Sequence, residues 1–363
     1  MNDYTAKVSK INKKGLINFL LQDIDNIQQV ILELLDNSMK ALLYESNKTI
    51  QILNNSTELY IQDNGMGINP EKIDSILSHF EEQNSENNST LSKFGIGLKS
   101  SLYYKMRRNN PFSFILSSWL DDNNEIMSSL ILITLVQEEG DDQNSITYKT
   151  VYPSPSAIQL CNKVFNNKTG TLIFSTETPI NFDITSNKEI LDMMIQKIEN
   201  MSNFSINPAS HDDKDNLEIL QKLYSPLITD NFNIHYNNEI LTQDNFIKDT
   251  DTLIFDIPLY RYNNGSFFKT DDPTLYLYKK YEKGSGKGQI HTTKIPKTNL
   301  DINNLTHIAN VKFYKAKPDK ENCVIQYTPE NNRVLQRNNF SQIKNLSRTV
   351  NTSYMRCDVT LVD

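Results

Sequence analysis

The sequence is poor in cysteine and has no long hydrophobic run. Its 363 residues include three cysteines, Cys161, Cys323 and Cys357, which have neither the spacing of a zinc site nor the even number of a disulfide framework. The longest apolar run, residues 130–136, is far shorter than the roughly 20 residues that a membrane-spanning helix needs. Residues 1–14 are polar and lack the apolar core of a signal peptide. These absences predict no membrane partner and a reducing location, either cytoplasmic or, in a eukaryote, nuclear.

An excess of basic charge is also missing. Lysine and arginine number 37 against 44 aspartate and glutamate residues, which gives a formal net charge of -7. This balance argues mildly against a surface devoted to nucleic acid, although a local basic patch is compatible with it. Hydrophobic residues make up 38% of the chain and charged residues 22%, so the apolar content suffices for packed cores. At roughly 100–200 residues per domain, the length predicts two or three domains.

The first half of the chain alternates helical and strand-like patterns. In residues 15–43, apolar side chains recur every three or four positions, as in helices that bury one face. Runs rich in β-branched and aromatic residues predict an antiparallel meander at residues 111–119, 125–138 and 145–152. The other elements expected here are strands at residues 49–53, 58–62 and 169–174, helices at residues 69–80 and after residue 94, and a polar loop at residues 81–92.

A change of pattern near residues 179–187 predicts a boundary between a first domain, residues 1–183, and a second domain, residues 184–363. We interpret the glycine-rich residues 284–288 as a surface loop, and tyrosines such as Tyr260 and Tyr276 as strand residues, not as a base-stacking platform. The elements expected in the second half are helices at residues 188–201, 217–227 and 340–350, and strands at residues 232–236, 253–257, 275–278, 311–314, 323–327 and 355–362.

The first motif that can carry chemistry is Glu-Leu-Leu-Asp-Asn-Ser-Met-Lys-Ala, from Glu33 to Ala41, on a predicted helix. Glu33 and Asn37 are four residues apart and therefore lie on one helix face. A carboxylate can polarise or deprotonate a water, and an amide oxygen beside it can bind magnesium, which prefers oxygen ligands. Taken alone, the motif also fits an ordinary exposed helix.

The second motif is Asp-Asn-Gly-Met-Gly-Ile, from Asp63 to Ile68, at the end of a predicted strand. Gly65 and Gly67 would let the backbone approach a flat ligand, while the Asp63 carboxylate accepts a hydrogen bond from it. An adenine amine is a suitable donor for that carboxylate. Taken alone, the motif also fits a tight turn.

The third motif, Gly-Ile-Gly-Leu-Lys-Ser, runs from Gly95 to Ser100 at the start of a predicted helix. Glycines at this place would leave backbone N–H groups free to face phosphate oxygens, with help from the helix dipole and from Lys99. A single Gly-x-Gly before a helix is weak evidence, and the segment does not match the P-loop pattern.

In this order and spacing the three motifs resemble those of the GHKL ATPase superfamily, which includes gyrase-type topoisomerases, ninety-kilodalton heat-shock chaperones, MutL proteins, histidine kinases and MORC proteins. Residues 170–173, Gly-Thr-Leu-Ile, resemble the late strand of the same family. The resemblance implies an α+β fold in which a two-layer α/β sandwich, with helices on one face of a mixed sheet, binds ATP. An α/β transducer-like domain with a ribosomal-protein-fold core would follow.

Carried over by position, the resemblance implies that Glu33 is the general base for the attacking water, Asn37 is the magnesium ligand and Asp63 reads the adenine amine. The hydroxyl of Thr171 would support Asp63. The other residues that it places at the nucleotide are Gly65, Gly67, Ile68, Lys93, Gly95, Gly97, Leu98, Lys99 and Ser100, with residues 81–93 as the ATP lid. Lys40 departs from the pattern, because several branches carry aspartate at its position.

The branch within the superfamily is less well defined by the motifs. No histidine precedes Glu33, which disfavours the histidine kinases. Residues 323–327 followed by residues 331–335 resemble a strand and an Asn-Arg-Leu-type signature in the second domain of MORC and bacterial heat-shock-chaperone-like ATPases. That domain normally supplies a phosphate-binding lysine after its next strand, which here is expected at residues 355–362. Either the chain is a fragment of a longer protein, or a lysine such as Lys294, Lys297 or Lys315 takes this place.

The sequence therefore predicts a slowly hydrolysing ATPase that needs ATP and magnesium and that forms an ATP-dependent homodimer, a nucleotide-gated clamp like those of MORC proteins. Two alternatives remain open on the residues alone. One is a nucleotide-sensing module of a signalling or defence assembly with little catalysis. The other is a clamp that acts on DNA; the client of the clamp could equally be a protein.

Overall fold

The chain, seen in a computed structural model, divides into two compact units. The first comprises residues 1–217 and 229–241, and the second comprises residues 218–228 and 242–363. The expected boundary between residues 183 and 184 does not coincide with this division, because residues 232–240 form strands of the first unit's sheet. The structure describes residues 6–8, 26–72, 98, 101–102, 112–137, 144–151, 155–176, 187–201, 211–243, 246–262, 267–271, 274–280, 290–296, 305–317, 324–329, 334–339 and 355–362.

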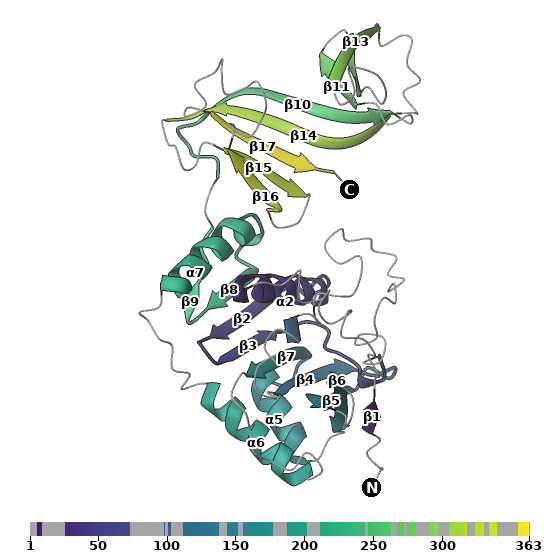
Figure 1. Ribbon diagram of the computed structural model, residues 1–363, viewed down its shortest axis with the longest axis vertical. Helices are drawn as coiled ribbons and strands as arrows, with labels where there is room; N and C mark the ends of the chain where they lie inside the picture. Colours follow the sequence, from purple (N-terminus) through teal and green to yellow (C-terminus); the bar gives the residue numbers. More distant parts are fainter. Residues whose placement is uncertain are drawn as a thin grey trace. The chain divides into compact units, whose positions relative to one another are not determined.

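A mixed β-sheet forms the centre of the first unit (Figure 1). Its strand order is β1 (Ala6–Val8), β6 (Asn144–Val151), β5 (Ile126–Gln137), β4 (Phe112–Leu120), β7 (Gly170–Thr176), β3 (Glu58–Asp63), β2 (Lys48–Asn54), β8 (Phe232–Tyr236) and β9 (Glu239–Ile240). β2 pairs with β8 in parallel, whereas β4, β5 and β6 form the expected antiparallel meander. The mixed sheet and the α+β class agree with the sequence prediction.

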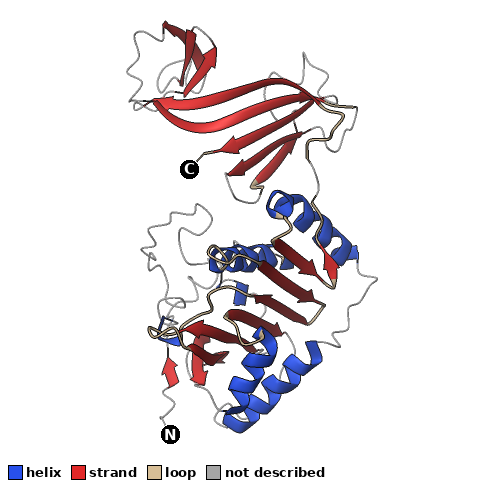
Figure 2. Cartoon of the chain, turned by 180° about the vertical axis from the view of Figure 1, so that it is seen from behind, coloured by secondary structure: helices blue, strands red, loops and turns tan. Residues whose placement is uncertain are grey.

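Helices pack against both faces of this sheet (Figures 1 and 2). Alternate side chains of β3 point to opposite faces, as the pleat requires. Asp63 contacts Ser38 of helix α2 (Ile27–Ala41) on one face. On the other face, Gln62 donates to the backbone of α5 (Pro155–Phe165) and Tyr60 donates to that of α6 (Asn187–Asn200). The resemblance implied helices on a single face, so the structure differs here: α5 and α6 cover the second face.

Helix α2 begins and packs as its sequence indicates. The side chain of Asn26 caps its N-terminus by accepting the Gln29 backbone N–H at 3.0 Å. Four apolar residues at helical spacing are buried on its inner face: Val30, Ile31, Leu34 and Leu35. The part of the expected helical region before residue 26 lies outside the described residues.

The face that carries α5 and α6 holds an apolar core of the first unit. Aromatic rings at its centre lie close together, with centroids 4.6 Å apart for Tyr60 and Phe174 and 4.9 Å apart for Phe114 and Phe174. The buried members of this core are Leu53, Tyr60, Phe114, Leu116, Leu130, Leu132, Leu160, Cys161, Phe165, Leu172, Phe174, Met193, Met194 and Ile198. Burial raises the pKa of the Cys161 thiol to about 11, so this cysteine acts as an apolar core residue.

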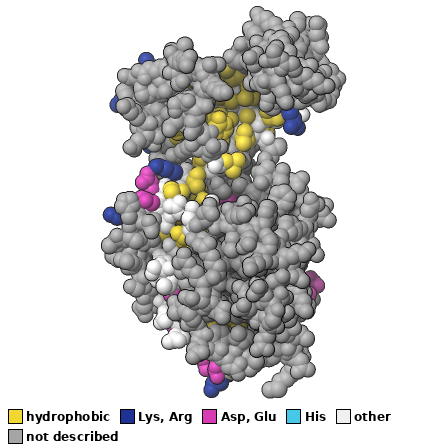
Figure 3. Space-filling model, viewed as in Figure 1, with side chains coloured by type: hydrophobic (Ala, Val, Ile, Leu, Met, Phe, Trp, Pro, Cys, Tyr) yellow, Lys and Arg dark blue, Asp and Glu magenta, His cyan; other side chains and the backbone are white. Residues whose placement is uncertain are grey.

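The second unit is built on another sheet, joined by the C-terminal part of α7 (His211–Tyr224) and a 3-10 turn, η3 (Ser225–Leu227). On the face drawn in Figure 3, hydrophobic side chains gather over this sheet. Its strand order is β13 (Ile290–Pro296), β12 (Thr274–Lys280), β11 (Phe267–Asp271), β10 (Thr252–Tyr262), β14 (Leu305–Lys315), β17 (Met355–Leu361), β15 (Val324–Pro329) and β16 (Gln336–Asn339).

A buried ion pair joins β17 to the segment that precedes β10 in the second unit. The Arg356 guanidinium contacts the Asp251 carboxylate and donates to the backbone carbonyl of Phe246 at 3.2 Å. Both ion-pair side chains are almost completely buried, so removing either partner would leave a buried charge without its counter-ion. The pair therefore holds residues 246–251 against β17.

Sequence patterns predicted most of the strands that the structure describes. Those expected at residues 49–53, 58–62 and 169–174 correspond to β2, β3 and β7, and the helices expected at residues 188–201 and 217–227 correspond to α6 and to the region of α7 and η3. Helix α5 and strands β1, β9, β11, β13 and β16 were not anticipated. Of the helix expected at residues 69–80, the structure describes the 3-10 turn Pro70–Lys72. Residues 81–92, 284–288 and 340–350 lie outside the described residues.

Candidate nucleotide site

The structure describes part of the predicted nucleotide site. Outside the described residues lie Lys93, Gly95, Gly97, Lys99 and Ser100, together with the proposed lid. The predicted site residues that it does describe are Glu33, Asn37, Asp63, Gly65, Gly67, Ile68, Leu98 and Thr171.

Helix α2 carries Glu33 and Asn37 one turn apart. Both side chains are partly buried, at the border between the buried and exposed faces of the helix. The side-chain nitrogen of Asn37 is buried and has no hydrogen-bond partner among the described residues. A buried amide donor without a partner is costly, and a ligand oxygen would satisfy it.

Asp63 is buried at the end of β3, with 4% of its surface exposed. Its Oδ2 accepts the Ser38 hydroxyl at 2.9 Å, and its Oδ1 accepts the Gly65 backbone N–H at 3.0 Å. Burial raises the pKa of Asp63 to about 6, although hydrogen bonds from the Gly65 backbone, the Ser38 side chain and the Thr171 backbone each favour the ionised form. The carboxylate is thus held in a defined orientation with acceptor capacity to spare.

The glycine turn that follows Asp63 packs against the end of α2. Met66 donates its backbone N–H to the carbonyl of Ala41 at 3.1 Å. A Cβ on Gly65 would lie 2.6 Å from the same carbonyl oxygen, so this close approach requires glycine. With the Ser38–Asp63 hydrogen bond, these contacts join the helix that carries Glu33 and Asn37 to the turn that carries Asp63.

Gly67 has the strictest requirement for glycine. Its φ is +74°, and a Cβ would lie 2.1 Å from the carbonyl oxygen of Ser118. The next residue, Ile68, donates its backbone N–H to the Ser117 hydroxyl at 2.6 Å. The turn from Asp63 to Ile68 is therefore held at one end by α2 and at the other by β4.

A row of buried polar residues crosses the sheet at the level of Asp63. Strand register places Asp63 opposite Thr171, Thr171 opposite Ser117, and Ser117 opposite Ser129. Residues directly opposite each other share a face, so the row lies on the face that α2 covers. All four residues are buried. Thr171 thus lies beside Asp63, and the interaction that favours the ionised carboxylate comes from its backbone, whereas support by its hydroxyl stays a prediction.

Comparison with family models identifies the kind of domain to which these residues belong. Residues 25–171 match the model described as "Histidine kinase-, DNA gyrase B-, and HSP90-like ATPase". These residues form a GHKL-type ATPase domain. The match begins just before α2 and ends at the second residue of β7, so it includes all three motifs and Thr171. No curated protein matches the chain.

Of the third motif of the GHKL domain, the structure describes Leu98, and just after the motif it describes residues 101–102. Leu98 is helical and partly buried, and the hydroxyl of Ser101 faces the backbone carbonyl of Val30 at 3.5 Å. This contact places Ser101 beside the first turn of the helix that carries Glu33.

Lys40 adds a cation near the acidic residues of α2. Burial lowers the pKa of Lys40, and the charges of Asp36 and Glu33 oppose this effect. The departure from the family pattern noted in the sequence thus changes the charge beside Glu33, the proposed base of this GHKL domain.

Ser38 and Ser117 are site residues that the sequence analysis did not single out. A signal for Ser38 was available, because it lies seven residues after Ile31 and four after Leu34 and so shares their buried helix face. Ser117 had no such signal, since only the pairing of β4 with β7 brings it to the glycine turn. No group of three or more potential metal-ligating His, Cys, Asp or Glu side chains occurs in the part of the chain that the structure describes. The described helices include none that is long and apolar enough to cross a membrane.

Proposed function

We propose that the GHKL domain binds ATP with magnesium, hydrolyses it slowly, and closes a homodimeric clamp of the MORC or heat-shock-chaperone kind. The observation that carries the proposal is the buried Asp63 carboxylate, tied by Ser38 to the helix that bears Glu33 and Asn37. A buried acceptor at one end and a helix with a carboxylate and an amide at the other fit a purine nucleotide.

In this proposal Asp63 accepts a hydrogen bond from the adenine amine, supported by Thr171. Asn37 holds magnesium through its side-chain oxygen, and Glu33 accepts a hydrogen bond from the attacking water and takes its proton. Magnesium, when bound, would neutralise phosphate charge. The remaining residues proposed to contact the nucleotide are Gly65, Gly67, Ile68, Lys93, Gly95, Gly97, Leu98, Lys99 and Ser100.

Slow turnover follows from the energetics of closure. Ordering a lid over the nucleotide costs conformational entropy, and phosphate and dimer contacts must offset that cost. We propose that the second unit acts as the transducer of this closure, and that Lys294, Lys297 or Lys315 supplies the phosphate-binding lysine.

Two variants test the assigned roles. Glu33→Ala should abolish phosphate release while ATP affinity, measured by calorimetry, stays within about threefold of wild type, because the carboxylate acts on water.

Asp63→Asn should weaken ATP binding by roughly ten- to a hundredfold, since a hydrogen bond to a charged group contributes about 1.5–3 kcal/mol.

Loss of both binding and hydrolysis in Glu33→Ala would refute the general-base role, and full ATP affinity in Asp63→Asn would refute the adenine role. A wild-type chain that binds ATP without releasing phosphate, even in a longer chain that includes further residues, would favour the nucleotide-sensing module. Binding to DNA that falls steeply with salt would favour the DNA-acting clamp.

A further inference from the structure

Ser38 makes a contact that no assigned role of the domain explains. We propose that Ser38 is a positioning residue that keeps Asp63 a hydrogen-bond acceptor and thereby sets the preference for a purine with an amino group at position 6. This inference rests on the proposed nucleotide site.

The geometry singles out Ser38 among the residues of α2. Its side chain is buried, with 3% exposed, and its hydroxyl donates across to Asp63 Oδ2 at 2.9 Å. A serine in a helix often donates to the carbonyl four residues earlier instead. Here the hydroxyl links two elements that are 25 residues apart in the sequence.

The hydrogen bonds around Asp63 determine what a ligand must offer. Oδ2 accepts the Ser38 hydroxyl and Oδ1 accepts the Gly65 backbone N–H, and a hydrogen bond from the Thr171 backbone also favours the ionised carboxylate. The Ser38 hydroxyl donates its single proton to Oδ2, and this bond favours the ionised carboxylate, which can only accept. The remaining lone pairs of Asp63 therefore also require a donor from the ligand.

Adenine and hypoxanthine differ in the group that they carry at position 6. The 6-amino group of adenine donates a hydrogen bond, whereas the 6-oxo group of hypoxanthine accepts one. A buried carboxylate facing a carbonyl oxygen leaves two acceptors opposed, which is costly where water is excluded. Without the Ser38 donor, the Asp63 carboxylate should be less well oriented and less strongly held in its ionised form. The site should then discriminate less between the two bases.

The test compares the affinities of ATP and ITP, with magnesium, for the full chain by titration calorimetry. Wild type should bind ATP more tightly than ITP. Ser38→Ala should weaken ATP binding by about five- to tenfold and ITP binding by less than about twofold, so that the ATP-to-ITP affinity ratio falls. Ser38→Thr, which keeps the hydroxyl, should restore the ratio toward wild type.

Ser113→Ala is the matched control. Ser113 is fully buried on the same sheet face and its hydroxyl is 2.8 Å from that of Ser175. Ser175 lies four residues from Thr171 along β7, about 13 Å away. The variant thus removes a comparable buried hydroxyl outside the site, and its ATP-to-ITP ratio should equal that of wild type.

An equal loss of affinity for both nucleotides in Ser38→Ala would overturn the proposal, and so would an unchanged ratio. If Ser38→Ala does not fold, Ser38→Cys replaces it; a thiol is a weak donor, so a wild-type ratio in that variant would also overturn the proposal. Loss of ATP binding in Asp63→Asn with no effect of Ser38→Ala would reject this inference alone. A wild-type chain that binds neither nucleotide would reject the proposed function as well.

Discussion

At the scale of single residues, Asp63 is under two opposing influences. Burial favours its neutral form and raises its pKa to about 6, whereas Ser38, Gly65 and Thr171 favour the carboxylate. The net result is an acid whose pKa is higher in the folded chain than in the unfolded chain. Its ionisation therefore opposes folding, and the proposed ligand contact would offset that cost.

This imbalance predicts a pH dependence of stability. Between about pH 4 and 6 the folded chain holds a proton on Asp63 that the unfolded chain has lost, so the free energy of unfolding falls as pH rises through this window. Across this pH window, the free energy of unfolding of wild type should fall by on the order of 3 kcal/mol relative to that of Asp63→Asn. Urea denaturation of both proteins at a series of pH values measures the difference, and the comparison cancels the groups that both proteins share.

A difference between the two proteins that stays constant from pH 4 to pH 7 would contradict this account. A difference that grows in favour of wild type with rising pH would do so too, because it would mean that folding lowers the pKa of Asp63.

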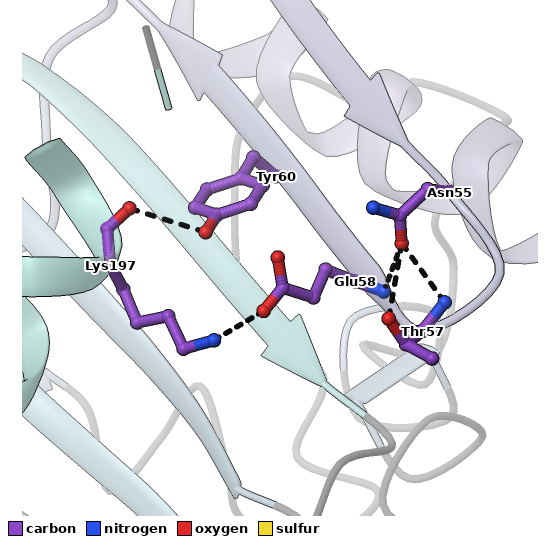
Figure 4. A network of polar contacts seen from close by, with 5 residues as sticks. All are labelled: Asn55, Thr57, Glu58, Tyr60 and Lys197. Atoms are coloured by element: carbon purple, nitrogen blue, oxygen red, sulfur yellow. Dashed lines mark hydrogen bonds and ion pairs between the residues drawn. The ribbon is translucent and has the colours of Figure 1, made fainter. Parts of the chain in front are cut away.

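At the scale of secondary-structure elements, a small polar network attaches α6 to β3 on the face opposite α2 (Figure 4). Lys197 pairs with Glu58, and its ammonium lies 5.6 Å from the centroid of the Phe174 ring. Tyr60 donates its hydroxyl to the Lys197 carbonyl at 3.2 Å. Burial, and secondarily Glu58, raise the pKa of Tyr60, so the phenol remains a donor.

The turn that leads into β3 is closed by the side chain of Asn55 and by its backbone N–H, which donates to the Glu58 carbonyl at 3.0 Å. Asn55 Oδ1 accepts the backbone N–H groups of Thr57, at 2.9 Å, and of Glu58, at 2.8 Å (Figure 4). An Asn side chain that accepts from residues two and three positions later is a common way to stabilise a tight turn. The turn and the α6 network thus both support the strand that ends at Asp63.

Removal of the Lys197 charge tests this attachment. Lys197→Met keeps most of the aliphatic stem but loses the ion pair and the contact with the ring. The Lys197 and Glu58 side chains are 20% and 17% exposed. We therefore expect the substitution to lower the free energy of unfolding by about 1–2 kcal/mol, which lies between the values for exposed and buried ion pairs. Chemical denaturation monitored by tryptophan fluorescence provides the measurement.

Lys222→Met serves as its control, because Lys222 pairs with Glu218 on the surface of α7 with side chains 42% and 63% exposed. The free energy of unfolding of that variant should lie within about 0.5 kcal/mol of the wild-type value. Equal effects of the two substitutions would show that burial does not strengthen the Lys197 pair.

The elements differ in how well their sequences predicted them. Helix α2 and strands β2 to β5 have strong periodic patterns and were anticipated. Helix α5 has a proline at its first position, which is a start signal, but it is short and follows a strand-rich region. Strands β11 and β13 carry polar and charged residues among apolar ones, and pairing with β12 determines their conformation.

At the scale of the whole molecule, the chain passes between its two units more than once. Residues up to 217 of α7 belong to the first unit and residues 218–228 to the second, after which β8 and β9 return to the first. Within the first unit, Asn216 donates to the Tyr236 hydroxyl of β8 at 3.3 Å. Within the second, the backbone N–H of Val334 donates to the Leu223 carbonyl at 2.8 Å. Helix α7 therefore contributes residues to both units.

ATP-dependent dimerisation is the prediction that belongs to this scale. With magnesium and a non-hydrolysable ATP analogue, the mass measured by light scattering should double, because contacts between two chains would offset the cost of ordering the lid. The mass of Asp63→Asn should not change at the same analogue concentration, because most of this variant would remain without bound nucleotide. A mass that stays constant at saturating analogue would count against the clamp and for a nucleotide sensor.

The sequence by itself determined the GHKL motifs, the α+β class and the positions of Glu33, Asn37 and Asp63 on a helix and at a strand end, because local periodicity and spacing carry that information. Only the tertiary structure decided that Ser38 holds Asp63, that Ser117 holds the glycine turn, and that α5 and α6 cover the second face of the sheet. These features depend on strand register and helix packing between distant segments, and no local pattern encodes such contacts.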